Sequence, residues 1–339
     1  MAPAVLVENL KKSYGEVEAV KDVSFAIAPG EIFGLLGPNG AGKTTTIRCL
    51  CTLMLPDAGT IELNGVSVLS DPRTARRMLG YIAQEVALDK VLTGRELLAL
   101  QAAIYHLPKA EARARIEQML NLLEIADIAD KKTGTYSGGQ QKRLDLAAGL
   151  LHQPAVLVLD EPTVGLDIES RTAVWRFLRQ LRDEGTTILL TSHYLEEVDA
   201  LANRVAIIDA GEVISAGTPA ALKAEVGGDR ITLRIKEFTA DAEADSARDL
   251  LATLPAVQSV IVNSAQGNSL NLVVDKGGEA LSAVQSALKD AGLPTFGISQ
   301  SQPSLDDVYL AATGRTLMDA EMAAAGTRDL KKERKQSMR

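Results

Sequence analysis

The 339-residue sequence has few cysteines, few aromatic residues and no long apolar run. Aromatic residues make up 4% of the chain, and the two cysteines, Cys49 and Cys51, lie on one predicted helix. Side chains two positions apart on a helix point to different faces, so we expect reduced, buried thiols in preference to a metal or redox site. No apolar run approaches the roughly 18 residues that a membrane-spanning helix needs. The N-terminus also lacks the order of regions typical of a signal peptide, so we expect a cytoplasmic location.

Positive charge is scarce as well. The chain has 44 acidic against 36 basic residues and a formal net charge of -8. An excess of negative charge is unfavourable for binding the negatively charged backbone of DNA or RNA, so we expect no nucleic-acid partner. The hydrophobic content of 46% is ordinary for a globular protein with a full core, and the length suggests about two domains.

The segment "GLLGPNGAGKTTTI" contains a phosphate-loop pattern. Gly37, Gly42, Lys43 and Thr44 match G-x-x-x-x-G-K-[ST] between the strand-like "EIFGLL" and the helix-like "TTTIRCLCTLM". In such a loop the backbone N–H groups surround the β-phosphate, the lysine reaches the β- and γ-phosphates, and the threonine hydroxyl ligates Mg²⁺. We therefore predict that Mg²⁺ and a nucleotide are bound by Gly37, Pro38, Asn39, Gly40, Ala41, Gly42, Lys43, Thr44 and Thr45.

Two carboxylates follow an uninterrupted apolar run in "AVLVLDEPTVGLD". The run Val156–Leu159 suits a central parallel strand that is buried on both faces. At its end we assign Asp160 to the magnesium ion and Glu161 to the water that attacks the γ-phosphate. A polar strand end followed by a capped helix would also fit Asp-Glu-Pro, but the phosphate loop upstream favours the catalytic interpretation.

His193 and Gln84 are the remaining candidates for this site. His193 ends the predicted strand "GTTILLTSH", at the edge of an α/β sheet where ligands gather. From there an imidazole can contact the γ-phosphate and hold Glu161 and the water. Gln84 follows a short strand in "GYIAQE", and its amide can reach the magnesium ion or the water, although the signal is weak by itself.

A second anion site is predicted in "YSGGQQKRLDLAAGLL". Leu144, Ala147 and Leu151 have the spacing of one helix face. The preceding Ser137, Gly138 and Gly139 therefore lie at a helix N-terminus, where backbone N–H groups and the helix dipole favour an anion. The chain would then hold two phosphate sites about a hundred residues apart.

The order of these motifs carries a family resemblance. In chain order they are Tyr14, Gly37–Thr45, Gln84, Ser137-Gly138-Gly139-Gln140, Asp160-Glu161, Gly165-Leu166-Asp167 and His193. Over Val5–Ala221 this order resembles the ATP-binding subunit of ATP-binding-cassette (ABC) transporters, and the Ser-Gly-Gly-Gln step separates that family from other phosphate-loop proteins.

The resemblance implies how the second site is used. Tyr14 would stack on adenine, and Ser137, Gly138, Gly139 and Gln140 would bind the γ-phosphate of ATP held by a second copy of the chain. Two chains would pack head to tail around two Mg-ATP, with Asp167 also in the nucleotide site. Tyr136 stands where most of the family has leucine, so altered packing without loss of binding is expected there.

The resemblance also implies a helical subdomain at about residues 85–150, made of helical segments separated at Pro108. Its surface, with Glu85–Thr93, would dock on membrane helices. The short insert argues against the long coiled coils of DNA-repair relatives, and the single cassette argues against tandem translation factors.

A second domain is predicted after Gly227 and Gly228. The order βαββαβ over residues 230–300 favours a ferredoxin-like α+β unit. The segment Pro303–Arg315 resembles the C-terminus of drug-exporter cassettes of the daunorubicin-resistance type, whose membrane partner is a separate ABC-2-type permease; polysaccharide and haem exporters share parts of this pattern. In the basic tail we expect a solvated terminus in preference to a lipid contact.

The predicted fold is thus an α/β phosphate-loop ABC ATPase core at 1–226, an α+β domain at 227–315 and a charged flexible tail at 316–339. The predicted function is an ATPase subunit that powers a separate exporter of drugs, lipids or polysaccharides from the cytoplasmic face of the membrane. The alternative is a soluble ABC-type clamp that acts on protein or nucleic acid without a permease. The transported substrate cannot be read from this chain, because it would contact the permease.

Overall fold

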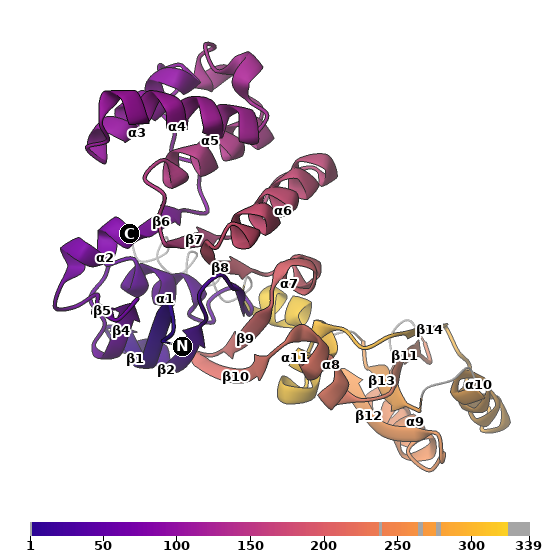
Figure 1. The fold of residues 1–339 in the computed structure, drawn as a ribbon. Helices are drawn as coiled ribbons and strands as arrows, with labels where there is room; N and C mark the ends of the chain where they lie inside the picture. Colours follow the sequence, from indigo (N-terminus) through magenta and orange to yellow (C-terminus); the bar gives the residue numbers. More distant parts are fainter. Residues whose placement is uncertain (1, 237–238, 264–266, 276–278, 325–339) are drawn as a thin grey trace, which may run out of the picture. The chain divides into compact units, whose positions relative to one another are not determined.

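The computed structural model describes residues 2–236, 239–263, 267–275 and 279–324. The chain forms two compact units, Met1–Val213 and Ile214–Arg339 (Figure 1). The predicted boundary at Gly227 and Gly228 stays a prediction. Helix α8 (Pro219–Val226) packs against helix α11 (Leu305–Thr313), which is why α8 groups with the second unit.

A ten-stranded sheet has the order β5-β4-β1-β2-β10-β9-β3-β8-β7-β6, and all its strands lie in the first unit except β10, which begins there and ends in the second unit. One half is antiparallel and pairs β1 with β2 and β4. The other half, from β9 through β3, β8 and β7 to β6, is parallel. The strands are β1 (Val5–Tyr14), β2 (Val17–Ile27), β3 (Ile32–Leu36), β4 (Ala58–Leu63), β5 (Val66–Ser67), β6 (Leu79–Ile82), β7 (Val156–Asp160), β8 (Thr187–Ser192), β9 (Arg204–Asp209) and β10 (Glu212–Gly217).

The central parallel strands explain where the site forms. Every residue of β3, β7 and β8 is buried, and for Val156–Leu159 of β7 the uninterrupted apolar run predicts this. Since β3 pairs with β8 and β8 with β7 in parallel, their carboxyl ends reach the same edge of the sheet. The segments that follow these strands begin at Gly37, Glu161 and His193, and they meet at that edge.

Helices of the first unit fall into two groups. Helices α1 (Lys43–Leu50), α2 (Pro72–Met78), α6 (Ile168–Asp183) and α7 (Leu195–Leu201) accompany the sheet, whereas α3 (Gly94–Ile104), α4 (Lys109–Leu122) and α5 (Gly138–Leu150) contact one another in a helical subdomain (Figure 1). Short 3-10 helices at Ala126–Ile128 and Thr133–Thr135 join α4 to α5. The structure confirms the two predicted helical segments on either side of Pro108. Proline has no backbone N–H, and at this position between the helices no helical hydrogen bond is lost.

Cys49 and Cys51 are both buried on and next to α1. Burial raises the pKa of the Cys49 thiol to about 11 and also raises that of Cys51, so both thiols stay protonated at neutral pH. The described helices include none long and apolar enough to span a membrane.

The second unit contains the predicted ferredoxin-like order. It consists of β11 (Asp229–Arg234), α9 (Asp241–Leu251), β12 (Val257–Asn263), β13 (Ser269–Val274), α10 (Glu279–Asp290) and β14 (Gly297–Ser301). The sheet order is β12-β13-β11-β14 with antiparallel pairs, and one sheet face packs on α9 and α10. The fold class predicted from the sequence is therefore confirmed for both units.

The segment predicted as a flexible tail from residue 316 begins differently. Residues 317–324 are helical, and Leu317 and Ala320 are buried, because apolar side chains at this spacing share one helix face. The basic segment 327–339, for which a solvated terminus was expected, lies outside the described residues.

Candidate nucleotide-binding site

The phosphate loop joins β3 to α1 with a backbone that only glycine tolerates well. Gly42 is the N-cap of α1 with a φ of 111°, and a Cβ there would lie 2.6 Å from the Ala19 carbonyl oxygen. Gly37 has a φ of 155°, and a Cβ would collide with the carbonyl oxygen of Ile208. Close backbone approach and positive φ therefore account for both glycines of the motif. The loop ends at the N-terminus of α1, where a helix favours anions.

Lys43 points its ammonium into this loop. Its Nζ donates to the carbonyl oxygens of Gly37 at 2.6 Å and Pro38 at 3.2 Å. The same Nζ lies 3.9 Å from Oε1 of Glu161, and both side chains are almost fully buried. A single buried cation thus lies between the loop and the carboxylate that the sequence assigned to water activation.

Asp160 is fixed by a threonine that the sequence analysis missed. The Thr191 hydroxyl, on β8, donates to Oδ1 of Asp160 at 2.6 Å and accepts the backbone N–H of Glu161 at 3.0 Å. Thr44 Oγ1 donates to the same Oδ1 at 3.5 Å. The signal for Thr191 was its position two residues before His193, at the end of a buried strand.

Glu161 is the centre of the site. Gln84 Nε2 donates to its Oε2 at 2.8 Å, and His193 Nδ1 lies 3.2 Å from its Oε1. Burial alone would raise the pKa of Glu161, but the hydrogen bond with His193 and the charges of His193 and Lys43 outweigh it and lower that pKa. The carboxylate is therefore ionised at neutral pH, as a proton acceptor must be. The residue also has a φ of 50°, an uncommon backbone conformation.

The structure thus gathers Lys43, Thr44, Gln84, Asp160, Glu161 and His193 at the carboxyl edge of the parallel strands. Tyr14 lies at the end of β1, where the residue is 46% exposed and its hydroxyl donates to Sδ of Met54. Its stacking on adenine, and the phosphate contacts of Asn39, Gly40, Ala41 and Thr45, stay predictions.

The Ser-Gly-Gly-Gln segment begins α5, as predicted. Ser137 is the N-cap: its Oγ accepts the N–H of Gln140 at 3.3 Å, and Gln140 Oε1 accepts the N–H of Ser137 at 2.9 Å. Ser137 and Gly138 are exposed, and a Cβ on Gly138 would meet nothing within 4 Å. The N-terminal end of α5 is therefore open to an external ligand. Its predicted role toward the γ-phosphate stays a prediction.

Asp167 caps the neighbouring helix α6. Its Oδ1 accepts the N–H of Ser170 at 2.7 Å, and Ser170 packs against Gly139 of α5. The predicted part of Asp167 in the nucleotide site stays a prediction, whereas its capping role is visible here.

Lys142 links α5 to the segment of Gln84. Its Nζ donates to the carbonyl oxygen of Ala83 at 2.9 Å and lies 3.8 Å from Oδ2 of Asp145. The ammonium is almost fully buried, and burial lowers the pKa of Lys142. The helix that begins with the Ser-Gly-Gly-Gln segment is thus joined to the segment of Gln84 through one side chain and one peptide unit.

Oxygen ligands suited to Mg²⁺ are present at this edge. The Thr44 hydroxyl and the Asp160 carboxylate share a hydrogen bond, and hard oxygen atoms of this kind are the ligands that Mg²⁺ takes together with nucleotide phosphates and water. Among the described residues there is no group of three or more His, Cys, Asp or Glu side chains that could hold a metal by themselves. The hydroxyl of Thr44 and the carboxylate of Asp160 fit an ion that also binds the nucleotide phosphates.

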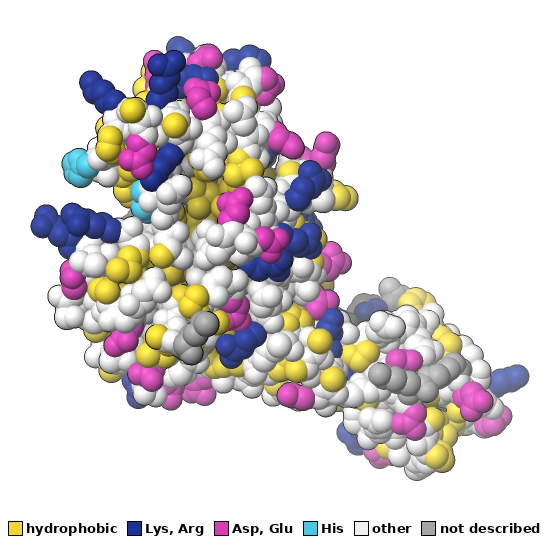
Figure 2. All heavy atoms as spheres, viewed as in Figure 1, with side chains coloured by type: hydrophobic (Ala, Val, Ile, Leu, Met, Phe, Trp, Pro, Cys, Tyr) yellow, Lys and Arg dark blue, Asp and Glu magenta, His cyan; other side chains and the backbone are white. Residues whose placement is uncertain are grey.

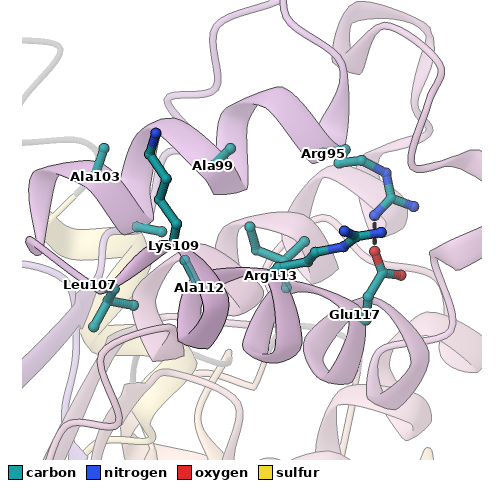
Figure 3. Close-up of a pocket in the computed structure, with 10 residues that line it drawn as sticks. Arg95, Ala99, Ala103, Leu107, Lys109, Ala112, Arg113 and Glu117 are labelled. Atoms are coloured by element: carbon teal, nitrogen blue, oxygen red, sulfur yellow. Dashed lines mark hydrogen bonds and ion pairs between the residues drawn. The ribbon is translucent and has the colours of Figure 1, made fainter.

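A cavity of about 750 Å³ lies between α3 and α4 of the helical subdomain. Figure 3 shows Ala99, Ala103, Leu107 and Ala112 along it, with Arg95 and Glu117 paired at one end. Lys109 and Arg113 also line it. The cavity therefore has an apolar floor and a charged rim.

Comparison with protein families identifies both parts of the chain. Residues 20–164 match the family described as ABC transporter, and residues 217–313 match the family described as ATP-binding protein DrrA1-3-like, C-terminal domain.

Individual relatives cover almost the whole chain. The daunorubicin resistance ATP-binding protein DrrA3 of Streptomyces coeruleorubidus is 43% identical, covering 92% of this chain and 96% of its own length. The Nod factor export ATP-binding protein I of Paraburkholderia xenovorans is 39% identical, covering 93% of this chain and 99% of its own. Among solved structures, a dimeric ATP-binding cassette in a post-hydrolysis state bound to ADP and phosphate has a TM-score of 0.58 and 26% identity, covering 63% of this chain and 98% of that one.

Proposed function

The chain belongs to the family of ABC transporter ATP-binding proteins, as an ATPase coupled to transport, and we propose that it works as a homodimer that powers a separate ABC-2-type permease. The grouping of Lys43, Gln84 and His193 around the ionised Glu161 supports hydrolysis, and the exposed start of α5 supports the dimer. Each of these contacts has a use in the hydrolysis of a γ-phosphate.

In this mechanism Lys43 exchanges its carbonyl partners in the loop for the β- and γ-phosphates. Glu161 orients the attacking water and accepts its proton, while His193 and Gln84 hold the carboxylate in position. Thr44, Asp160 and Gln84 Oε1 are the atoms that we assign to Mg²⁺, which supplies neutralisation of the phosphate charge when it is bound.

The second phosphate segment completes the site of a second copy. Ser137 and Gly138 are exposed at the start of α5, which suits a γ-phosphate presented by another chain. ATP would then bridge two protomers, and hydrolysis would remove the charge that both α5 helices face. The dimer should loosen, which converts the reaction into movement.

A pair of variants tests this arrangement. Lys43→Ala should abolish ATP binding, because it removes the charge that balances the phosphates. Ser137→Arg should leave ATP binding by the monomer almost intact and block ATP-driven dimerisation, measured by light scattering. If Ser137→Arg weakened binding in the monomer as severely as Lys43→Ala, the helix would serve its own nucleotide and the proposal would be wrong.

The cavity between α3 and α4 is the surface that we assign to the permease. Exposed Leu100 and Ile104 follow the same stretch of α3, and Val91 before it is 71% exposed. Figure 2 shows hydrophobic side chains among basic and acidic ones over this part of the unit. An amphipathic segment of a membrane protein could bury such a surface and pair with its charged rim.

Ala103→Glu tests that assignment, because it places a charge in the cavity. Co-purification with the permease from detergent-solubilised membranes should be lost while ATP binding remains. The matched control is Ala110→Glu, on an exposed position of α4 that does not line the cavity. Equal loss in both variants would remove the support for this surface.

The transported molecule is proposed only as a class. The relatives named above are linked by their descriptions to daunorubicin resistance and Nod factor export, which supports export of a drug, a lipid or a polysaccharide. The competing function is a soluble clamp acting on protein or nucleic acid. Recovery of ribosomes or DNA, with no multi-span membrane protein, in a pull-down from solubilised membranes would favour the clamp.

A further inference from the structure

The second unit contains a cavity of about 210 Å³ on the sheet face opposite its core. Ile231, Leu233, Leu270 and Leu272 pack on α9 and α10, so their neighbours along the strands face the other way. Strand pairing places Arg230 opposite Val273 and Asn271 opposite Ile261, and all four line the cavity. Residues of α8 and α11 line its remaining walls.

Arg230 has an unusual environment for a charged residue. It is only 4% exposed. Its Nε lies 3.1 Å from Oδ1 of Asp307, and its Nη2 donates to the Val226 carbonyl oxygen at 3.2 Å. The third nitrogen, Nη1, is buried without a hydrogen-bond partner within the part of the chain that the structure describes. A buried donor without an acceptor is costly, more so on a charged group.

Asn271 adds a second donor to the same wall. Its Oδ1 accepts the hydroxyl of Thr232 at 3.0 Å, while its Nδ2 is buried with no partner among the described residues. The nearby carboxylate of Asp307 is already occupied, because its Oδ2 accepts both the N–H and the hydroxyl of Ser304. The cavity therefore offers two donors and needs acceptors.

The remaining lining residues indicate which kind of group would lie beside the acceptor of a ligand. Val226, Ile261, Leu272, Val273, Leu310 and Ala311 are apolar, and the two remaining lining residues, Ser259 and the acidic Glu225, are both exposed. Water could accept from one donor, but it would leave this apolar wall in contact with solvent. The volume is smaller than the roughly 300–1,000 Å³ of pockets for drug-sized ligands. A compact molecule with one anionic end and one apolar end fits both walls.

We infer that this cavity binds a small organic acid, with its carboxylate on Arg230 and Asn271 and a short apolar body against Ile261 and Leu310. A carboxylate presents two oxygen atoms in one plane, which matches a guanidinium and a neighbouring amide. The site is separate from the ATPase machinery, so the inference goes beyond the proposed function.

Isothermal titration calorimetry with the full chain tests the chemistry. Isovalerate is the probe, isovaleramide is its uncharged match, and inorganic phosphate is an anion without an apolar body. Isovalerate should bind with a stoichiometry of one per chain. Isovaleramide should bind at least ten-fold more weakly because it lacks the charge that strengthens the hydrogen bonds, and phosphate at least ten-fold more weakly because it buries no apolar surface. Absence of isovalerate binding in the millimolar range, or equal or tighter binding of either control compound, would overturn the inference.

Three variants test the location. Arg230→Met removes the buried donor and should weaken isovalerate binding roughly ten- to hundred-fold. Ile261→Trp fills the cavity from β12 while Arg230 stays, so it should also abolish binding even if Arg230→Met fails to fold. Ser282→Trp, at an exposed position of α10, which packs on the opposite face of the sheet, is the matched control and should bind normally. Unchanged binding in Ile261→Trp would place the ligand elsewhere and refute the site.

Discussion

Tyr136 and Gly94 form a contact that can be tested quantitatively. Tyr136 is 6% exposed, and its hydroxyl donates to the Ile128 carbonyl oxygen at 2.7 Å. Gly94 is the first residue of α3, and a Cβ on it would lie 2.5 Å from the Tyr136 hydroxyl oxygen and 3.3 Å from the Ala129 carbonyl oxygen. The larger side chain at position 136 thus fits because residue 94 has no Cβ.

Gly94→Ala should destabilise the unit. The new methyl group must displace the ring or weaken its hydrogen bond, and overpacking of this kind costs about 1–3 kcal/mol. Alanine is favoured over glycine in helices by up to about 1 kcal/mol, which offsets part of that cost. We expect a net loss of about 1–2 kcal/mol in the free energy of unfolding.

In the Tyr136→Leu background, Gly94→Ala should no longer destabilise the unit. By itself Tyr136→Leu destabilises by about 1–3 kcal/mol, because the Ile128 carbonyl loses its donor and a large buried ring is replaced. In this background Gly94→Ala meets no hydroxyl and should be neutral or stabilising. The coupling energy between the two positions should then be about 1–3 kcal/mol in favour of the double variant.

Urea unfolding followed by fluorescence of Trp175 provides the assay, because this single tryptophan lies on α6 of the same unit. Gly138→Ala is the matched control: it is also the first residue of a helix, and its Cβ would meet nothing within 4 Å. It should show no coupling to Tyr136→Leu. If Gly94→Ala were equally destabilising in both backgrounds, the Tyr136 hydroxyl would not be the group that excludes a side chain at residue 94.

Further predictions concern chemistry and pH. Glu161→Gln keeps the shape of the side chain but removes its basicity, so ATP should bind without turnover and the ATP-bound dimer should accumulate in light scattering; near-normal ATPase activity would contradict the role of Glu161. His193→Ala should slow hydrolysis, and because His193 acts on Glu161 its effect on kcat should be far from additive with Glu161→Gln. Burial raises the pKa of Asp145 to about 6, so its carboxyl group binds a proton more tightly in the native state than in the unfolded chain. The native state therefore loses stability as the pH rises from about 4 to about 6. Asp145→Asn should therefore gain stability over the wild type by up to about 3 kcal/mol between about pH 4 and pH 7, measured by urea unfolding, and a constant difference would refute the assignment.

Local pattern was sufficient for much of the fold. The apolar run before Asp160, the glycine-rich loop before Lys43 and the helix face after Ser137 each concern residues that are neighbours in the chain. The sequence order of the second unit likewise predicted its sheet, because βαββαβ units have few antiparallel solutions.

Contacts between distant segments could not be predicted in this way. Thr191 on Asp160 and Lys142 on the Ala83 carbonyl depend on strand register and helix rotation, which one sequence does not reveal. For Arg230 the sequence indicated only an ordinary strand residue, because its burial depends on how α8 and α11 cover the sheet.

Lys142 gives a dimer of this chain a form of communication. In the proposed arrangement α5 faces the nucleotide of the partner, while Gln84 faces the chain's own, and the hydrogen bond to Ala83 ties the two together. If a nucleotide at one end changes the affinity at the other end by some factor, the reverse effect must have the same factor, since binding free energies in a cycle are reciprocal. The two ATP molecules would therefore bind as a coupled pair, and each protomer would sense the occupancy of its partner through one buried ammonium.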